Sequence, residues 1–176
     1  SSEEDVEEIV QKHVLKGEIA SSLQIQDEPV SQDFFDLYGD VAFFQRQCRV
    51  ALRNSGVVNP ENFDEYVHYK GFKALSKVLS KNDSNAVIKE VSNSRLRGRG
   101  GGGFPTGFKW ENAVKSPEKK RFIICNADEG DPGAFMDRSM LESDPYSVVE
   151  GMIIGGFAIQ ANRGFVYIRA EYPLAI

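Results

Sequence analysis

The chain has 176 residues, of which 41% are hydrophobic and 11% aromatic, enough for one packed domain or for a domain with an arm. Its formal net charge of −5 argues against nucleic acid or an anionic membrane as the main partner. The two cysteines are far apart in the sequence, so with the two histidines they are not expected to form the cluster of about four ligands of a structural zinc site, and an iron–sulfur cluster needs about four thiolates.

Neither a signal peptide nor a membrane span is predicted. The acidic stretch of residues 1–8 lacks the charged-then-apolar pattern of a signal peptide. The longest apolar stretch near the end, residues 152–159, is too short to cross a bilayer. We therefore expect a cytoplasmic protein, or one at the cytoplasmic face of a membrane complex, without direct membrane insertion.

The first predicted element is an amphipathic helix over residues 5–16, which Gly17 ends. A polar connector containing Pro29 is expected over residues 24–33. The run 43–52 follows neither the helical nor the strand period, and we expect it to be extended or irregular.

Three short helices are predicted next. Residues 59–61 supply an N-cap, a proline at the first helical position and an acid in the first turn, for a helix that runs to about Tyr69 and ends at Gly71. Apolar spacing over residues 72–79 indicates a second helix. Residues 82–84 offer caps for a third.

A strand, a long helix and a second strand are expected downstream. After one or two helical turns over residues 111–115, the compact apolar run 121–125 indicates a buried strand. Residues 145–160 are predicted as a long helix entered through Asp144-Pro145, and residues 165–168 as the second strand. This order predicts a parallel crossover unit. No closing element follows, so we expect the fold to be incomplete.

Glycine occupies six of the ten positions over residues 98–107. Without Cβ atoms, such a backbone can approach a bulky anion and point several N–H groups at it. The N-terminus of a following helix adds positive potential. Formal positive charge comes from Arg95, Arg97, Arg99 and Lys109. The loop therefore predicts a site for a phosphate or a nucleotide.

Two other interpretations of this glycine loop stay open: a flexible linker and an Arg-Gly nucleic-acid segment. The loop is not a dinucleotide fingerprint, because the segment before it is helical, and it is not a P-loop, because no Gly-Lys-Ser/Thr ends it. Phe104 and Pro105 stiffen the tract and argue against the linker. Trp110, the only tryptophan, is assigned to the core.

Asn126, Asp128, Glu129 and Asp131 directly follow the first predicted strand. Ligands of α/β sheets bind outside the carboxyl ends of strands, and carboxylates there accept hydrogen bonds from ribose or ribityl hydroxyls. The alternatives are a solvated turn, since Asp-Pro-Gly is good turn chemistry, and a weak calcium site, although the EF-hand spacing is absent.

The remaining reactive side chains are assigned simpler roles. Cys125 ends an apolar strand and is expected to be an inert core residue. His13 and His68 lie on predicted helices and are expected to be structural or solvated. Arg169 and Glu171 would lie at the same sheet edge as the acidic residues, or pair with each other.

Three motifs resemble those of one family. Residues 98–107, followed by Lys109-Trp110, are similar to the glycine-rich loop of the NADH-oxidising, FMN-binding flavoprotein subunit of complex I and of related NAD(P)-reducing hydrogenases and NAD-dependent formate dehydrogenases. Residues 126–133, with Asp137-Arg138 close behind, resemble its second motif, and residues 167–173 its third. Three long motifs in the right order make this resemblance specific.

The resemblance implies an α/β fold, with an N-terminal helical arm followed by an incomplete Rossmann-like FMN-binding domain with parallel strands. The start of the glycine loop and Lys109 would hold the FMN phosphate, and Asn126, Asp128 and Glu129 would contact the ribityl chain and ring. Phe104 would stack on the adenine of the nicotinamide nucleotide. The cofactor-binding residues expected from the resemblance are Gly98, Arg99, Gly100, Gly101, Gly102, Gly103, Phe104, Lys109, Asn126, Asp128, Glu129 and Asp131.

The chain also departs from the family. Asp131 would lie beside the nicotinamide, where the family often has Glu. Asn112 stands where an aromatic is often found, so one wall of the NADH pocket is expected to be weaker. No side chain is expected to act as a general base, and no metal ligands are expected in the chain as given.

The resemblance also divides the chain. Residues 1–23 look like the remnant last helix of a thioredoxin-like domain, 24–94 form a linker and helical segment, and 95–176 are the N-terminal part of the FMN- and NADH-binding domain. The segment 49–56, followed by 59–61, resembles the hydrogenase and formate dehydrogenase versions, which often carry Cys where Ser55 stands. This favours a bidirectional or NADP-linked hydrogenase subunit over complex I. A four-iron cluster is expected only in a missing C-terminal part.

The expected function is that of an oxidoreductase module, an FMN-dependent NAD(P)H dehydrogenase in its intact form. It would transfer a hydride from NADH or NADPH to FMN and pass electrons to iron–sulfur clusters. Its partners would be other subunits of a multisubunit oxidoreductase, including a two-iron ferredoxin-like subunit. The alternatives are a non-catalytic nucleotide- or phosphate-binding module and an inert fragment of the larger subunit.

Overall fold

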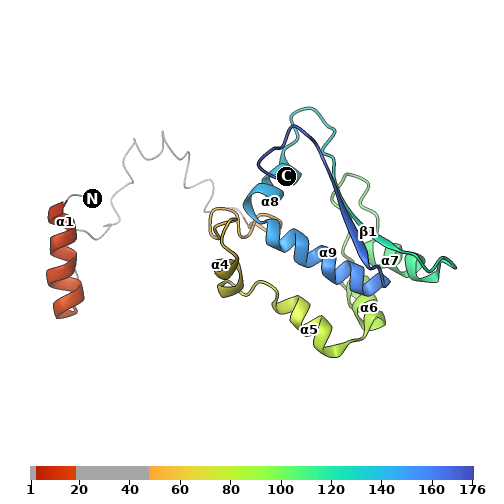
Figure 1. Cartoon of the computed structure of the whole chain (residues 1–176), viewed down its shortest axis with the longest axis horizontal. Coiled ribbons are helices and arrows are strands. Elements are labelled where there is room, and N and C mark those ends of the chain that lie inside the picture. Colours follow the sequence, from red (N-terminus) through yellow and green to blue (C-terminus); the bar gives the residue numbers. More distant parts are fainter. Residues whose placement is uncertain (1–2, 19–47) are drawn as a thin grey trace. The chain divides into compact units, whose positions relative to one another are not determined.

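The computed structural model describes residues 3–18 and 48–176 (Figure 1). They belong to two units, one up to Cys48 and one from Arg49 to Ile176. The first contains the helix α1 (Glu3–Glu8) and the wider turns of η1 (Ile9–Val14). The helix predicted over residues 5–16 is thus confirmed, and Gly17 follows it with φ +68°. The polar connector predicted over 24–33 lies outside the described residues.

Three helices open the second unit, as predicted: α4 (Phe63–His68), α5 (Lys73–Lys81) and α6 (Ser84–Ser94). The predicted start of α4 at residues 59–61 is wrong. The Asn59 side chain accepts a hydrogen bond from the Glu61 N–H at 2.9 Å and closes a turn. Asn62 caps the helix instead, accepting from the Glu65 N–H at 3.0 Å.

The short helix predicted over residues 111–115 belongs to a longer one, α7 (Thr106–Lys115). The glycine-rich sequence hides its start, because glycine is a poor helix former. Gly107 is buried, and a Cβ on it would lie 2.6 Å from the Cα of Ser92 in α6. Glycine therefore lets α6 and α7 pack backbone against backbone.

The predicted crossover unit is confirmed. The strands β1 (Phe122–Ala127) and β2 (Arg163–Ile168) pair in parallel, and α9 (Pro145–Ile159) connects them. Asp144 caps α9, accepting from the Ser147 N–H at 3.3 Å. One helix was not predicted: α8 (Met136–Ser143) lies between β1 and α9. Mixed helices and a parallel two-stranded sheet confirm the α/β class.

The helix α9 lies at the centre of the second unit, against both strands and against α5, α6, α7 and α8 (Figure 1). A Cβ on its Gly155 would lie 3.1 Å from both Trp110 and Ile123. Trp110 therefore packs where α7, α9 and β1 meet, in line with its predicted core position. The buried hydrophobic residues are Val58, Tyr66, Ile88, Ala127, Leu141, Ala158, Ile159 and Tyr172.

A buried carboxylate ties α9 to the helices before the glycine loop. Glu150 accepts hydrogen bonds from the Tyr66 hydroxyl at 2.8 Å and from the N–H groups of Phe72 and Leu75 at 2.9 and 3.0 Å. Phe72 precedes α5 and has no capping side chain of its own. Glu150 therefore caps α5 from across the core.

The sheet face away from α9 carries apolar side chains in contact with solvent. Ile124 and Phe165 are partners in the strand register and are 63% and 54% exposed. Parallel sheets are usually covered on both faces. Among the described residues, α9 and its neighbours cover one face only.

Replacing Gly107 by alanine is expected to lower the free energy of unfolding by about 1–3 kcal/mol, the usual cost of overpacking a core. The new methyl group would collide with the backbone of Ser92. Urea unfolding measures the change. Gly102→Ala is the control, since a Cβ there meets nothing within 4 Å. Equal stability of the two variants would contradict the close packing of α6 on α7.

Tyr66 is expected to make the protein sensitive to alkali. Burial raises the pKa of its hydroxyl, and the hydrogen bond and negative charge of Glu150 raise this pKa further. Unfolded tyrosine ionises near pH 10, so the unfolded state loses its proton first and the free energy of unfolding falls as the pH rises above about 10. Urea unfolding against pH should show this slope in Tyr69→Phe and a smaller one in Tyr66→Phe. Identical slopes would contradict the assignment.

Candidate functional site

The glycine loop is closed at its base. The Gly98 N–H donates to the Phe104 carbonyl oxygen and the Thr106 N–H to that of Leu96, both at 2.9 Å. The Arg97 guanidinium donates to the Gly103 carbonyl oxygen at 3.0 Å. These bonds give the loop a fixed neck, which argues against a flexible linker. Arg97 was predicted to supply positive charge to a ligand, but its guanidinium instead stabilises the loop through this hydrogen bond to Gly103.

At the tip of the loop, the backbone N–H groups of residues 99–103 have no hydrogen-bond partner among the described residues. A Cβ added at Gly100, Gly101 or Gly102 would meet nothing within 4 Å. Gly101 and Gly103 have φ of +93° and +56°, which other residues adopt at a cost. The loop thus presents unpaired donors to open space.

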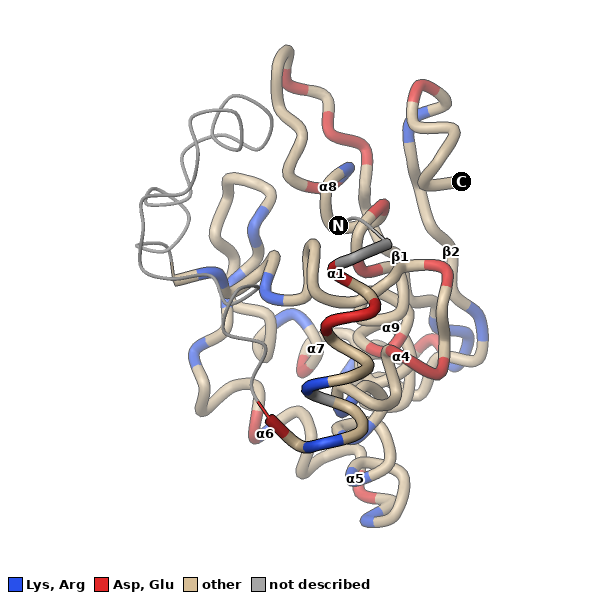
Figure 2. Tube along the Cα trace, turned by 90° about the vertical axis from the view of Figure 1, so that its left-hand side faces the viewer, with Lys and Arg blue, Asp and Glu red and all other residues tan. Residues whose placement is uncertain are grey.

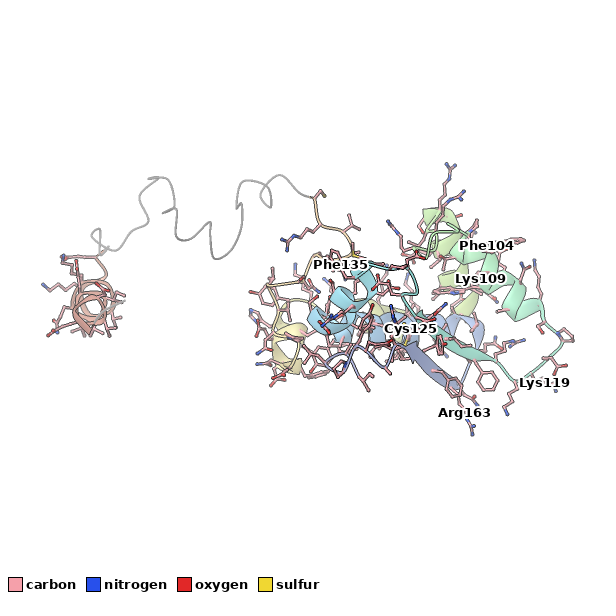
Figure 3. The ribbon with its side chains drawn as sticks, turned by 90° about the horizontal axis from the view of Figure 1, so that it is seen from above. Phe104, Lys109, Lys119, Cys125, Phe135 and Arg163 are labelled. Atoms are coloured by element: carbon pink, nitrogen blue, oxygen red, sulfur yellow. The ribbon has the colours of Figure 1, made fainter. Side chains whose placement is uncertain are left out.

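Positive charge and aromatic rings lie beside this loop. The helix α7 begins directly after it, and Pro105 provides no capping side chain. Lys109 lies on the first turns of α7, with its ammonium group 5.7 Å from the centre of the exposed Phe104 ring (Figure 3). The Phe108 ring lies 5.9 Å from that of Phe104. Arg99 is exposed. An anion at the loop would meet the dipole of α7 and these charges.

Arg121 sets the direction in which this loop points, and sequence reasoning missed it. Its guanidinium donates to the carbonyl oxygens of Ala113 and Val114 at 3.0 Å each, which joins the C-terminus of α7 to the start of β1. A basic residue shortly after a predicted helix is the signal that would have found this cap.

The glycine loop and the carboxyl end of β1 therefore lie toward the same end of the unit. Joined at Arg121, α7 and β1 run back in opposite directions. The 10 residues of α7 rise by about 15 Å and the 6 residues of β1 by about 20 Å. Figure 1 shows the loop before α7 rising toward the end at which the strands finish.

The loop after β1 carries acidic residues (Figure 2). Asp128 and Asp131 are exposed, and the Asp128 N–H donates to the Asn126 side chain at 3.2 Å. The Ala134 N–H donates to the Asp131 carbonyl oxygen at 3.1 Å, which confirms a turn. No group of three or more potential metal ligands gathers among the described residues. Asn126, Asp128 and Asp131 thus offer polar groups near the edge toward which the glycine loop points.

Glu129 differs from its acidic neighbours because its carboxylate is engaged within the protein. It accepts from the N–H groups of Asp137 and Arg138 at 3.0 and 3.3 Å and from the Tyr172 hydroxyl at 3.3 Å. Burial raises the pKa of Glu129, but these hydrogen bonds and one from Met136 outweigh burial and hold that pKa below its usual value. This carboxylate, predicted to contact the flavin, caps α8.

The segment after β2 reaches the same place. Arg169 donates to the Glu129 carbonyl oxygen at 2.8 Å and pairs with Glu171 at 3.4 Å. The sequence predicts both the position of Arg169 and this pair, but not the partnership of Tyr172 with Glu129. Cys125 is half-buried, and burial and the charge of Asp137 raise the pKa of its thiol, as expected of an inert residue.

Comparison with known proteins assigns this arrangement to a family. Residues 91–176 match the Nuo51 FMN-binding domain. Residues 91–176, just under half of the chain, thus belong to the Nuo51 FMN-binding domain family. The match begins before the glycine loop and includes all three motifs.

Relatives of this Nuo51-type chain are much longer. It is 54% identical over 132 residues to the HndC subunit of the NADP-reducing hydrogenase of Solidesulfovibrio fructosivorans, covering 75% of this chain and 26% of the relative. It is 50% identical over 131 residues to a subunit of the NADH-quinone oxidoreductase of Aquifex aeolicus, covering 74% and 30%. The chain thus spans between a quarter and a third of these relatives.

A solved structure of an NAD⁺-reducing [NiFe]-hydrogenase, in the air-oxidised state, has a related fold. It superposes with a TM-score of 0.56 at 28% identity, over 83% of this chain and 27% of that one. A second structure of such a hydrogenase, in the H₂-reduced state, gives a TM-score of 0.51 at 44% sequence identity. This match covers 53% of this chain and 16% of the hydrogenase chain. No described helix is both long and apolar enough to span a bilayer.

The described residues fit FMN. Its phosphate requires N–H donors and positive charge, which the open amides of residues 99–103, Arg99 and Lys109 provide. Its ribityl hydroxyls require acceptors, which Asn126 and Asp128 offer. A Cβ would project into the open space at the loop, which explains the use of glycine there.

Proposed function

We propose that this chain binds FMN between the glycine loop and the loop after β1, as part of a module that oxidises NADH or NADPH. The observation that carries the proposal is the set of unpaired amides at residues 99–103, on a loop that points toward the acidic edge of the sheet. A phosphate is the group that such amides recognise. The family match names the nucleotide.

We assign each residue a role that its position supports. The unpaired backbone amides of residues 99–103, with Arg99 and Lys109, hold the phosphate, since they combine donors with positive charge. The N–H of Gly98, predicted to bind the cofactor, is instead engaged by the Phe104 carbonyl oxygen. Asn126 and Asp128 accept hydrogen bonds from the ribityl chain. Phe104, 48% exposed beside Lys109, offers a ring face to the adenine of the nicotinamide nucleotide. Asp131 lies on the exposed part of the acidic loop and is placed on the nicotinamide side.

Bound FMN supplies the hydride acceptor, and the protein contributes position and electrostatics. The glycine loop fixes one end of the nucleotide and the acidic loop the other. None of the side chains in this arrangement is required to take up a proton.

The larger assembly follows from the names of the relatives. They are subunits of a hydrogenase and of NADH-quinone oxidoreductase, which supports a place in a multisubunit oxidoreductase. Within such an assembly we propose iron–sulfur subunits as partners, including a two-iron ferredoxin-like one. The sequence given holds two cysteines, too few for an iron–sulfur cluster, so the clusters that receive the electrons would be held by residues outside this sequence. A position at the cytoplasmic side of such a complex completes the proposal.

Titration of the chain with FMN and with riboflavin, followed by flavin fluorescence, tests the proposal. Riboflavin lacks the phosphate and is expected to bind at least about tenfold more weakly, since one charge-assisted hydrogen bond contributes about 1.5–3 kcal/mol. Anaerobic NADH should then bleach bound FMN. Equal affinity for both flavins, or no binding of FMN, would contradict the proposal. Binding of ADP without any flavin would favour a non-catalytic nucleotide-binding module.

Gly101→Ala is expected to weaken FMN binding by about tenfold, because forcing an alanine to a positive φ costs about 1–2 kcal/mol or displaces the loop. Gly56→Ala is the matched control, because Gly56 also has a positive φ, of +74°, and room for a Cβ, but lies outside the glycine loop. Fluorescence titration compares the two. If both variants bind FMN like the parent, the loop conformation is not what recognises the nucleotide.

A further inference from the structure

One carboxylate holds both ends of the loop that links β1 to α8. Glu129 begins this loop, and its side chain accepts the N–H groups of Asp137 and Arg138 at the start of α8. Phe135, which precedes α8, provides no capping side chain. The Glu129 carboxylate therefore joins the two ends of the exposed segment 130–133.

A tyrosine from the third motif fastens this carboxylate to the end of β2. Tyr172 is 6% exposed and donates its hydroxyl to Glu129 at 3.3 Å. Two guanidinium groups lie near its ring, that of Arg138 at 5.3 Å and that of Arg169 at 5.7 Å from the ring centre. Arg169 also donates to the Glu129 carbonyl oxygen at 2.8 Å. Residues 169–172 therefore bind Glu129 twice, through its side-chain carboxylate and through its backbone carbonyl oxygen.

We propose that Glu129 and Tyr172 are positioning residues that set the orientation of the loop over residues 128–133 toward FMN, without contacting the flavin themselves. This inference rests on the proposed function. We call the pair the Glu129–Tyr172 latch.

Apart from those of the latch carboxylate, the Arg169 contact and the hydrogen bond from the Asp128 N–H to the Asn126 side chain, the other hydrogen bonds of the loop among the described residues lie within it. Its internal backbone hydrogen bonds are from the Gly130 N–H to Asp128 and from the Ala134 N–H to Asp131, at 3.0 and 3.1 Å. Both are local and do not tie residues 130–133 to any other element of the fold. Asp128 and Asp131, the acceptors proposed for the ligand, are carried by this loop. Releasing the latch should thus affect the ribityl and nicotinamide end of the site and spare the phosphate end.

The test compares Glu129→Gln and Tyr172→Phe with the control Tyr167→Phe, which alters a tyrosine on β2 that is 61% exposed. A glutamine accepts hydrogen bonds at one oxygen only, so the Asp137 and Arg138 amides should exchange with solvent at least about tenfold faster in Glu129→Gln. FMN affinity should fall by about tenfold in that variant and about threefold in Tyr172→Phe, with no change in the control.

Two further readouts separate positioning from other roles. Inorganic phosphate, used as a competitor of FMN, should keep its inhibition constant, because the glycine loop is untouched. The visible spectrum of FMN bound at saturation should match that of the parent. Equal losses of FMN and phosphate affinity would show that the latch only stabilises the fold in general. An altered flavin spectrum would show that Glu129 contacts the flavin directly. Either result would overturn the proposal.

The experiment distinguishes a failure of the latch proposal from a failure of the proposed function. If the parent does not bind FMN, the proposed function is wrong, and with it the orienting role. If the parent binds FMN but both variants bind it equally well, only the latch is wrong. Unchanged amide exchange at Asp137 and Arg138 in Glu129→Gln would likewise overturn the latch.

Discussion

The hydrogen bonds from Arg121 to the last carbonyl groups of α7 are the constraint on which the arrangement depends. They join the C-terminus of a helix to the first residues of a strand, so the other ends of these two elements point the same way. One of those ends carries the glycine loop and the other the acidic loop. Gly107 and Gly155 allow the helices to pack closely enough to hold this geometry.

The two loops have opposite electrical character. The glycine loop offers unpaired amides, Arg99 and Lys109, whereas the loop after β1 offers carboxylates. A flavin nucleotide matches this polarity, because its phosphate is anionic and its ribityl chain donates hydrogen bonds. The chain as a whole is acidic, with a net charge of −5, so the positive region is local. Nonspecific attraction of nucleotides to the whole protein is therefore a weak explanation of binding.

Local signals in the sequence predicted the elements whose causes are local. Asp144 and Pro145 mark the start of α9, and the apolar run after Arg121 marks β1. The helix α8 has no such signal, because its cap is Glu129, which lies several residues upstream and acts across a loop. The start of α7 was missed because its close contact with Ser92, rather than helix propensity, explains Gly107. The bond between Tyr172 and Glu129 joins residues 43 apart and depends on the parallel pairing of the strands.

An NMR titration of the backbone amides with FMN tests most directly whether one nucleotide engages both loops. The resonances of residues 99–103 and of residues 128–131 should shift together, with one common dissociation constant. Those of Lys119 and Arg163, at the other end of the strands in Figure 3, should stay in place. Shifts confined to one loop, or different dissociation constants for the two, would contradict a shared site.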